Sequence, residues 1–237
     1  MIFNVKAFYA VFIVVMIVSM ASVGLVSQSS GNNTVKPSPI DITATPVISA
    51  APVNFASPAP VIDGTQPFVA TLKTNKGDIE ITLATDTPLA VNSFAFLAAK
   101  RFFDGAGFFY IDHDFWAQVG DPDCRTDSKA TCTGTRDAGY KLPVENGVLK
   151  HVKWSVVAPE VQGGGNQVSG GQFRILFTTD ERLDGRETVL GTVTKGQEIL
   201  EQQANFLLCT ALTQTTPDCA KDLSTALVIE SVLVEPK

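Results

Sequence analysis

The sequence contains few of the side chains that metal and nucleophilic sites usually require, because its 237 residues include only two His and four Cys. Neither His lies near a Cys pair, so a zinc site and a Cys–His nucleophile are both disfavoured. Basic side chains are also scarce, since 18 Lys and Arg face 24 Asp and Glu and give a net charge of −6. Nucleic-acid binders usually present a basic surface to phosphate, so nucleic acid is not an expected partner. An apolar content of 45% nevertheless excludes disorder for most of the chain.

Charge is absent from residues 7–26, which read AFYAVFIVVMIVSMASVGLV. About 20 apolar residues span the hydrocarbon core of a bilayer as a helix, so this segment predicts a single membrane anchor. Lys6 precedes the segment and no Lys or Arg follows until Lys36, which predicts a cytoplasmic N-terminus and an extracytoplasmic remainder. A cleaved signal peptide is the alternative, with Ser19 and Ala21 at the −3 and −1 positions and a secreted product. Both alternatives place the rest of the chain outside the cytoplasm.

Residues 27–66 differ sharply in composition, with six of the thirteen prolines, many Ser, Thr and Ala, and only three charges. Proline removes backbone donors, and little here could form a buried face, so the segment predicts a semi-extended linker. The remaining residues, 67–237, are enough for one domain with a sizeable core. The sequence therefore predicts three parts: an anchor or signal peptide over 1–26, a linker over 27–66 and a domain over 67–237.

The four cysteines fall into two pairs, Cys124 with Cys132 and Cys209 with Cys219, and polar, turn-rich residues separate the members of each pair. Thiols oxidise outside the cytoplasm, so we expect two local disulfides that staple loops. Four cysteines allow three connectivities, of which 124–132 with 209–219 is favoured.

The hydrophobic pattern of the domain predicts many short strands and two helices. Residues 68–85 alternate apolar and polar side chains around a Lys-Gly-Asp turn, which is typical of a β-hairpin. Asp86 or Thr87 can cap a helix that begins at Pro88 and runs to about residue 100. Further strands are predicted at 107–111, 115–119, 153–158, 172–178, 187–194 and 225–234, and a second helix at 196–208. This pattern indicates a closed, mainly antiparallel barrel.

Five blocks of sequence carry a family resemblance. They are TLKTNKGDIEITLATDTPLAVNSFAFLAAKRFFDGAGF, FWAQVGDPD, GTRDAGYKLPVEN, GGQFRILFT and RLDGRETVLGTVTKGQEIL. In this order they resemble the cyclophilin-type peptidyl-prolyl cis-trans isomerases over nearly all of residues 68–208. The resemblance implies a mainly β fold, a closed eight-stranded antiparallel barrel capped by two helices. It also implies that the protein isomerises X–Pro bonds in proline-containing polypeptides and helps them fold, without a cofactor or a metal.

The chemistry of this family needs no covalent step. Rotation about a peptide bond costs roughly 18–20 kcal/mol, because the nitrogen lone pair is delocalised into the carbonyl group. A catalyst needs an apolar pocket for the pyrrolidine ring and a donor aimed at the prolyl nitrogen, since that contact strengthens as delocalisation is lost. In the family an arginine supplies the donor, and a nearby glutamine contacts the substrate carbonyl.

The family positions transfer to this sequence with a mixed result. Gln118 takes the position of the glutamine, whereas Tyr110 stands where the arginine is expected. The resemblance assigns substrate binding to six positions: Phe115, Trp116, Ala158, Phe173, Leu183 and Glu187. Arg174 replaces a pocket aromatic, and it could either supply a guanidinium to the same cavity or pair with Glu187.

Three functions remain open on this sequence, the third being a purely structural envelope protein that uses only the barrel. A neutral tyrosine is a weaker donor than a guanidinium, because charge-assisted hydrogen bonds are roughly twice as strong as neutral ones. Loss of a preorganised donor typically costs about 10²–10³ in rate. The first hypothesis is an isomerase, weakened or inactivated at its catalytic corner. The second is a non-catalytic cyclophilin-like module of the cell envelope that binds peptides or proteins.

Overall fold

The computed structural model describes residues 52–62, 66–208, 219–220 and 222–237. The chain divides into two compact units, Met1–Val47 and Ile48–Lys237, and all of the described residues belong to the second unit. The predicted anchor or signal peptide, residues 7–26, lies outside the described residues. None of the helices in the described ranges combines the length and the apolar character that a membrane crossing requires.

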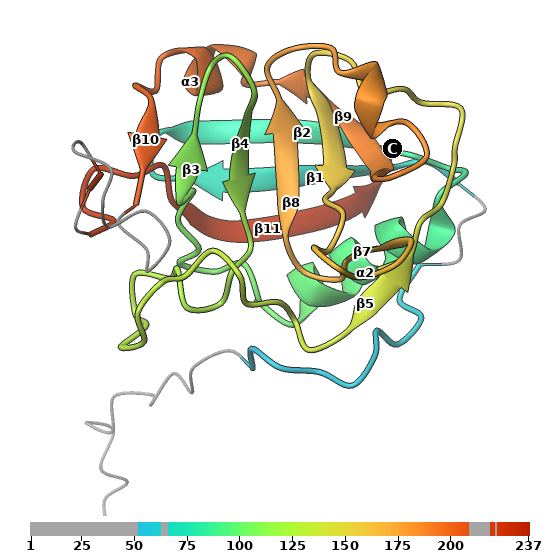
Figure 1. Cartoon of the computed structure of the whole chain (residues 1–237), viewed down its shortest axis with the longest axis horizontal. Coiled ribbons are helices and arrows are strands. Elements are labelled where there is room, and N and C mark those ends of the chain that lie inside the picture. The colour runs from blue at the N-terminus through green and yellow to red at the C-terminus, as the bar shows by residue number, and fades with distance from the viewer. Residues whose placement is uncertain (1–51, 63–65, 209–218, 221) are drawn as a thin grey trace, which may run out of the picture. The chain divides into compact units, whose positions relative to one another are not determined.

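Nine strands form one sheet that curls around the core, as Figure 1 shows, in the order β10-β3-β4-β8-β6-β9-β2-β1-β11. All neighbouring strands in this order are antiparallel. Their bounds are β1 (Phe68–Thr74), β2 (Gly77–Leu83), β3 (Tyr110–Ile111), β4 (Trp116–Val119), β6 (Ser155–Ala158), β8 (Phe173–Leu176), β9 (Thr188–Lys195), β10 (Phe206–Leu207) and β11 (Ile229–Pro236). A separate two-stranded sheet pairs β5 (Lys141–Pro143) with β7 (Gln167–Ser169).

The sheet differs from the predicted closed barrel of eight strands. Strands β10 and β11 are its two edges, and no ladder joins them in the part of the chain that the structure describes. Strand β10 offers only two residues, which pair with β3, and β11 pairs with β1 alone. The backbone therefore leaves the circle unclosed. The fold is a mainly β, curled and open half-barrel with few helices.

The first predicted elements agree with the structure. Strands β1 and β2 form the expected hairpin, and helix α2 (Pro88–Ala99) begins at the predicted proline. Thr87 occupies the N-cap position, but its hydroxyl donates to the Val189 carbonyl oxygen at 2.9 Å and makes no cap bond. The carboxylate of Glu145 accepts the N–H groups of the first helical turn instead, at 3.1 and 2.8 Å. A residue 55 positions away thus caps this helix.

The second predicted helix is shorter than the pattern at 196–208 suggests. Helix α3 (Gln197–Glu201) covers little more than one turn, and the chain then enters β10 at Phe206. Pairing of β10 with β3 overrides the helical pattern, since tertiary contacts often outweigh local propensity. Figure 1 places α2 and α3 at opposite ends of the curled sheet. A short 3₁₀ helix, η2 (Glu181–Leu183), precedes β9.

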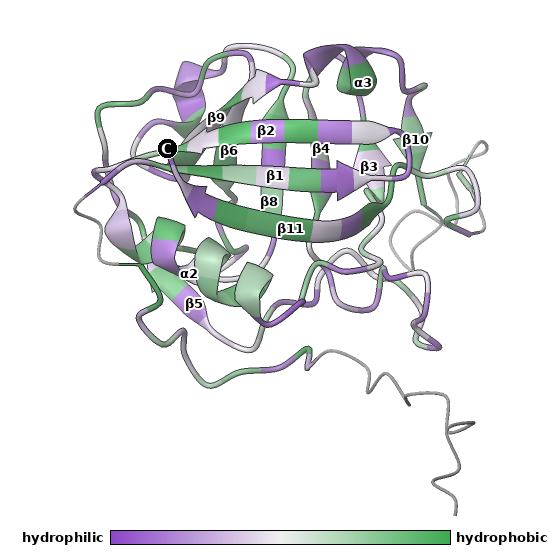
Figure 2. Cartoon of the chain, turned by 180° about the vertical axis from the view of Figure 1, so that it is seen from behind, coloured by the Kyte–Doolittle hydropathy of each residue, from purple (hydrophilic) through white to green (hydrophobic). Residues whose placement is uncertain are grey.

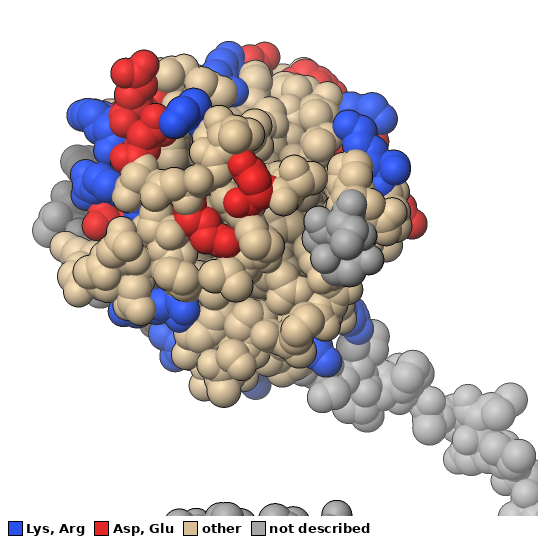
Figure 3. Space-filling model, turned by 90° about the vertical axis from the view of Figure 1, so that its right-hand side faces the viewer, with Lys and Arg blue, Asp and Glu red and all other residues tan. Residues whose placement is uncertain are grey.

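The core lies inside the curl of the sheet. Strands β3, β4 and β8 form the wall nearer the viewer in Figure 1, and Figure 2 shows β2, β1 and β11 on the opposite side. The largest fully buried side chains of this core are all Phe, Leu or Ile: Phe102, Phe103, Phe108, Phe173, Leu72, Ile79, Ile81, Leu97, Ile175, Leu200 and Leu227. On the side of the molecule seen in Figure 3, acidic and basic groups are interspersed with uncharged surface.

The predicted disulfide between Cys124 and Cys132 is confirmed. It closes the start of a long loop between β4 and β5. Cys219 is also disulfide-bonded, whereas Cys209, its predicted partner, lies outside the described residues.

The last part of the predicted linker touches the domain. Residues 52–62, named the strap from here on, run past α2 in Figures 1 and 2. Val53, Phe55 and Ile62 of the strap pack against the core. The sequence predicts little buried surface in this segment, and Phe55 departs most from that expectation because its ring lies 5.1 Å from the ring of Phe96.

Candidate functional site

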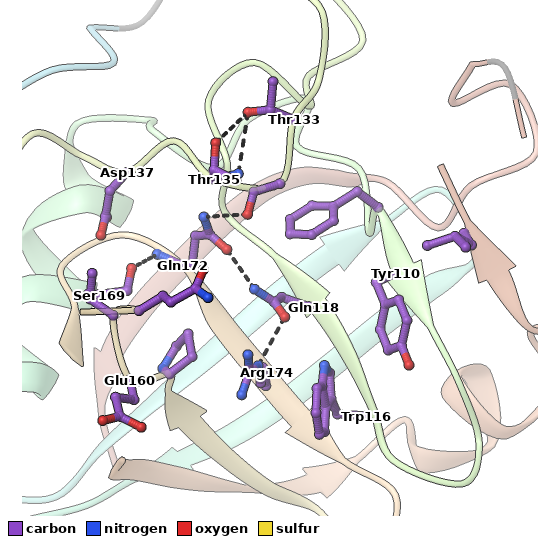
Figure 4. A pocket seen from close by; sticks show the side chains of 16 residues that line it. Tyr110, Trp116, Gln118, Thr133, Thr135, Asp137, Glu160, Ser169, Gln172 and Arg174 are labelled. Atoms are coloured by element: carbon purple, nitrogen blue, oxygen red, sulfur yellow. Dashed lines mark hydrogen bonds between the residues drawn. The ribbon is translucent and has the colours of Figure 1, made fainter. Parts of the chain in front are cut away.

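A groove of about 620 Å³ opens over strands β3, β4 and β8 (Figure 4). Its floor carries Tyr110, Trp116, Gln118 and Arg174. One wall is formed by part of the loop after the disulfide, and the other by the chain that follows β6. Polar and aromatic groups from separate segments therefore converge here, as ligand sites usually require.

Strand register brings three of the predicted site residues into one row. Tyr110 of β3 pairs directly with Gln118 of β4, and Gln118 pairs directly with Arg174 of β8. Side chains at directly opposed positions lie on the same face of a sheet. All three therefore line the same groove, as Figure 4 shows.

The guanidinium of Arg174 is fixed from three sides. Its Nε donates to Gln118 Oε1 at 2.9 Å, and its Nη1 donates to Glu187 Oε1 at 2.6 Å. The guanidinium carbon lies 4.3 Å from the centre of the Trp116 ring, a cation–π contact. Nη2 makes no hydrogen bond within the described ranges. A preorganised cation with an unused donor thus sits on the groove floor.

Glu187 is the buried counter-ion of this cation. Its side chain is only 3% exposed, against 18% for Arg174. Burial raises the pKa of the Glu187 carboxyl, although the nearby guanidinium opposes this by lowering it. Burial likewise lowers the pKa of Arg174, which Glu187 opposes, but an arginine remains protonated at any ordinary pH. We therefore treat the two groups as an ion pair, the second of the roles that the sequence leaves open for Arg174.

The amide of Gln172 determines which way Gln118 points. Gln172 Nε2 donates to the backbone carbonyl oxygens of Arg136 at 2.6 Å and Gly134 at 3.3 Å. Carbonyl oxygens only accept, so Gln172 Oε1 must face Gln118 Nε2, at 2.7 Å. Gln118 Oε1 is then left to face Arg174 Nε. A single directed chain of hydrogen bonds thus runs from the groove wall to the guanidinium.

Tyr110 is placed in the groove but its hydroxyl is already engaged. It donates to Asp112 Oδ2 at 3.2 Å, and Figure 4 shows it directed away from Gln118. Burial and the adjacent Asp112 carboxylate raise the pKa of Tyr110 to about 12. The phenol is therefore neutral at ordinary pH, and its hydroxyl donates its hydrogen bond to Asp112.

Of the six residues that the resemblance assigns to substrate binding, Trp116 lines this groove, Glu187 lies buried behind it as the counter-ion of Arg174, and the other four lie elsewhere. Phe173 is 1% exposed and packs among core rings, because it neighbours Arg174 on β8 and successive strand residues face opposite sides. Ala158 is buried in the core for the same reason. Leu183 of η2 packs in a separate apolar cluster. Phe115 is 43% exposed and lines a second depression beside η2, with its ring 5.7 Å from that of Trp116.

Other groove residues were not singled out from the sequence. These are Thr133, Thr135, Asp137, Glu160 and Ser169. All but Ser169, the last residue of β7, come from loops, where strand periodicity gives no guidance. The disulfide spacing before Thr133 and the glycine run after Gln162 are the signals that could have directed attention to both walls.

The wall after the disulfide is pinned by a buried acid. Asp121 is fully buried, and its two oxygens accept the backbone N–H groups of Asp123 at 2.8 Å and Arg136 at 3.0 Å. Burial raises the pKa of Asp121, although both N–H groups oppose this.

Within the described ranges, no three His, Cys, Asp or Glu side chains gather as a metal site would require.

Comparisons with known proteins show the family to which the chain belongs. Residues 69–222 match the family model described as cyclophilin type peptidyl-prolyl cis-trans isomerase/CLD. A peptidyl-prolyl cis-trans isomerase of Helicobacter pylori strain J99 is 34% identical over 131 residues, which cover 55% of this chain and 75% of the relative. Peptidyl-prolyl cis-trans isomerase B of Streptomyces anulatus is 30% identical over 189 residues, 71% of this chain and 97% of the relative.

Solved structures show the same fold. A cyclophilin type peptidyl-prolyl cis-trans isomerase of Cryptosporidium parvum superposes with a TM-score of 0.56 at 20% identity, over 72% of this chain and 99% of that one. A second structure of that protein, in the presence of the dipeptide Ala-Pro, gives 0.55 at 19% identity, over 71% and 99%.

Proposed function

Because the chain belongs to the cyclophilin-type peptidyl-prolyl cis-trans isomerase family, we propose that it isomerises X–Pro bonds with Arg174 as its cation. The observation that carries this proposal is the 2.9 Å hydrogen bond from Arg174 Nε to Gln118 Oε1 on the groove floor. The cation reaches the glutamine from β8, whereas position 110 on β3 holds a neutral tyrosine. On this proposal the reaction needs no cofactor.

The guanidinium acts on the bond that must rotate. As an X–Pro bond twists, the lone pair localises on the prolyl nitrogen, which then becomes a better hydrogen-bond acceptor. A charged donor next to that nitrogen binds the twisted state more tightly than the planar one and so lowers the barrier. Nη2 of Arg174 is the unused donor, and the ring of Trp116 offers apolar surface for the pyrrolidine.

A second candidate is a peptide-binding module without turnover, and Glu187 is the observation that favours it. The carboxylate holds Nη1 at 2.6 Å and neutralises the charge of the cation. A guanidinium held in this way is a weaker electrophile toward a prolyl nitrogen. The same groove would then bind extended peptides but leave the rate of rotation unchanged.

We also propose that the domain acts outside the cytoplasm, on polypeptides that fold there. The uncharged run at 7–26 supports a membrane anchor or a signal peptide. The Cys124–Cys132 disulfide supports the same compartment, because disulfides persist in oxidising surroundings. Fractionation of cells, with protease added to intact and to lysed samples, tests this location. Recovery of the domain in the cytoplasmic fraction, with digestion by the protease only after the cytoplasmic membrane has been lysed, would contradict it.

Isomerisation kinetics on a short X–Pro peptide test the main proposal. We expect the wild-type chain to exceed the rate in buffer, and Arg174→Gln combined with Glu187→Gln to lose about 10²-fold, since both charges leave together. Tyr110→Phe tests the competing donor and should lower the rate far less, because its hydroxyl donates to Asp112. Wild-type rates equal to buffer would exclude the isomerase, and peptide-induced NMR shifts at Gln118 would then support the binding module.

A further inference from the structure

The strap is joined to the domain at two separate places. At its C-terminal half, Val61 N–H donates to Asn92 Oδ1 at 2.9 Å, and Asn92 Nδ2 donates to the Ala59 carbonyl oxygen at 3.1 Å. At its N-terminal half, Phe55 N–H donates to the Ala138 carbonyl oxygen at 2.7 Å. The first attachment holds the strap to helix α2. The second holds it to the loop between β4 and β5.

Phe55 also inserts its side chain. Its ring lies edge-on to Phe96 at 5.1 Å and 6.5 Å from Phe102, so it closes one side of the core. Gly139 lies directly under the strap, with φ of +101°. A Cβ at that position would collide with the Asn54 side chain and lie 2.5 Å from the Phe55 carbonyl oxygen. The loop and the strap are therefore fitted to each other at backbone distance.

The loop that Phe55 holds is the one that walls the groove. Asp137, next to Ala138, lines the groove, and its Oδ1 accepts the N–H of Gly171 at 2.7 Å. The carbonyl oxygens of Arg136 and Gly134 accept from Gln172, which orients Gln118 and hence Arg174. The path from the Phe55 amide to the groove floor is thus a continuous series of short contacts.

From this series we infer that Phe55 is a positioning residue for the groove: docking of the strap holds the wall at 133–138, so peptide binding and strap docking are coupled. Phe55 lies ahead of residues 69–222, which match the family model, so the coupling belongs to this chain's own N-terminal extension. The inference uses the groove of the proposed function as the binding site. A linkage of this kind is reciprocal, so a bound peptide also tightens the strap.

Two variants of the full-length chain test the coupling. Phe55→Ala removes the ring that anchors the strap next to the wall and keeps the backbone N–H, whereas Asn92→Ala removes the attachment to α2, which touches no groove residue. We expect Phe55→Ala to raise the Kd of a short Ala-Pro peptide about fivefold or more. Asn92→Ala should leave that Kd within about twofold. Equal Kd values for the two variants would overturn the inference, whatever their melting temperatures.

Hydrogen exchange gives a second readout that does not depend on turnover. In Phe55→Ala the amides of Arg136 and Gly171 should exchange faster than in the wild type, whereas in Asn92→Ala they should not. Unchanged exchange at both amides would contradict the coupling. If Phe55→Ala does not fold, Phe55→Leu takes its place in both experiments, because Leu keeps much of the apolar volume. We then expect smaller changes in the Kd and in the exchange rates, in the same direction.

Rescue separates positioning from a general loss of stability. A synthetic peptide of residues 50–62, added to the Phe55→Ala chain, should restore the Kd of the Ala-Pro peptide, and the same peptide with Ala at position 55 should not. Restoration by both peptides or by neither would contradict a role for this ring. If the wild type shows no isomerase activity but Phe55→Ala still raises the Kd of the Ala-Pro peptide, the proposed function is wrong and the coupling stands. If the wild type is active but Phe55→Ala leaves that Kd unchanged, only the coupling is wrong.

Discussion

The start of the domain and the groove differ in how far along the chain their contacts reach. Strands β1 and β2 pair through a tight turn between Thr74 and Gly77, and α2 follows at once. In the groove, Gln118 bonds to Gln172 and Arg174, which lie 54 and 56 residues away. The first region can be read from neighbouring side chains, whereas the second exists only after the sheet has formed. Four predictions separate local from distant support, from the largest expected effect to the smallest.

The buried ion pair is the most demanding of the distant contacts. Glu187→Ala should lower the free energy of unfolding by about 3–5 kcal/mol, because it leaves the guanidinium of Arg174 buried without its counter-ion. Arg174→Leu combined with Glu187→Leu should recover most of that loss. Urea denaturation measures both. A loss below about 1 kcal/mol in the single variant would mean that water screens the pair.

The disulfide joins residues that are close in the chain, whereas the other contacts that support the groove join residues far apart in the chain. Cys124→Ser combined with Cys132→Ser should cost about 2–3 kcal/mol of unfolding free energy, the value expected for closing so short a loop. The Kd of a groove peptide should also rise, because Thr133 to Asp137 follow the bond directly. Loss of stability with an unchanged Kd would show that the other contacts of the wall, from Asp121 and from the strap, hold it without the disulfide.

The cap of α2 joins residues far apart in the chain, although it lies in the region where most contacts join neighbouring residues. Glu145→Ala should lower the unfolding free energy by about 1 kcal/mol, since the first-turn N–H groups lose their acceptor. Glu235→Ala, at an exposed position on β11, is the matched control and should stay within about 0.5 kcal/mol. Thermal melts followed by circular dichroism measure both variants. Equal melting temperatures would mean that water replaces the cap.

The smallest effect at neutral pH concerns Tyr110, because its contribution changes only in alkaline solution. Its folded pKa of about 12 lies above the ordinary value of 10, so it contributes stability that is full below pH 10 and is lost as pH rises toward 12. Tyr110→Phe should therefore flatten the stability curve between pH 10 and 12 relative to the wild type. Tyr140, whose pKa is also about 12, contributes equally to both curves and cancels. Parallel curves would exclude a shift at Tyr110.

The sequence predicts much of the fold for a physical reason. The hairpin at 68–83, the proline that opens α2 and the Cys124–Cys132 bond each depend on residues close together in the chain. The open edges of the sheet do not, because β10 forms by pairing with β3 rather than by its own helical pattern. Local periodicity cannot foresee such a competition.

The site is predicted less completely than the fold. Motif positions find Tyr110, Gln118 and Arg174, and the register of three strands unites them. The same motif positions assign Phe173 to substrate binding, but its side chain lies in the core, because Arg174, the next residue on β8, faces the groove. The orientation of Gln118 also escapes the sequence, since it depends on the two backbone carbonyl oxygens that Gln172 meets in the wall.

The place of Arg174 on β8 has a consequence for small-molecule recognition. A compound that puts an apolar ring onto this part of the groove floor would meet a charged group, paired with Glu187 and lying against Trp116. Displacing that group would separate two desolvated charges. We expect a ligand of this groove to bind more tightly when it carries an acceptor for Nη2, which makes no hydrogen bond among the described residues.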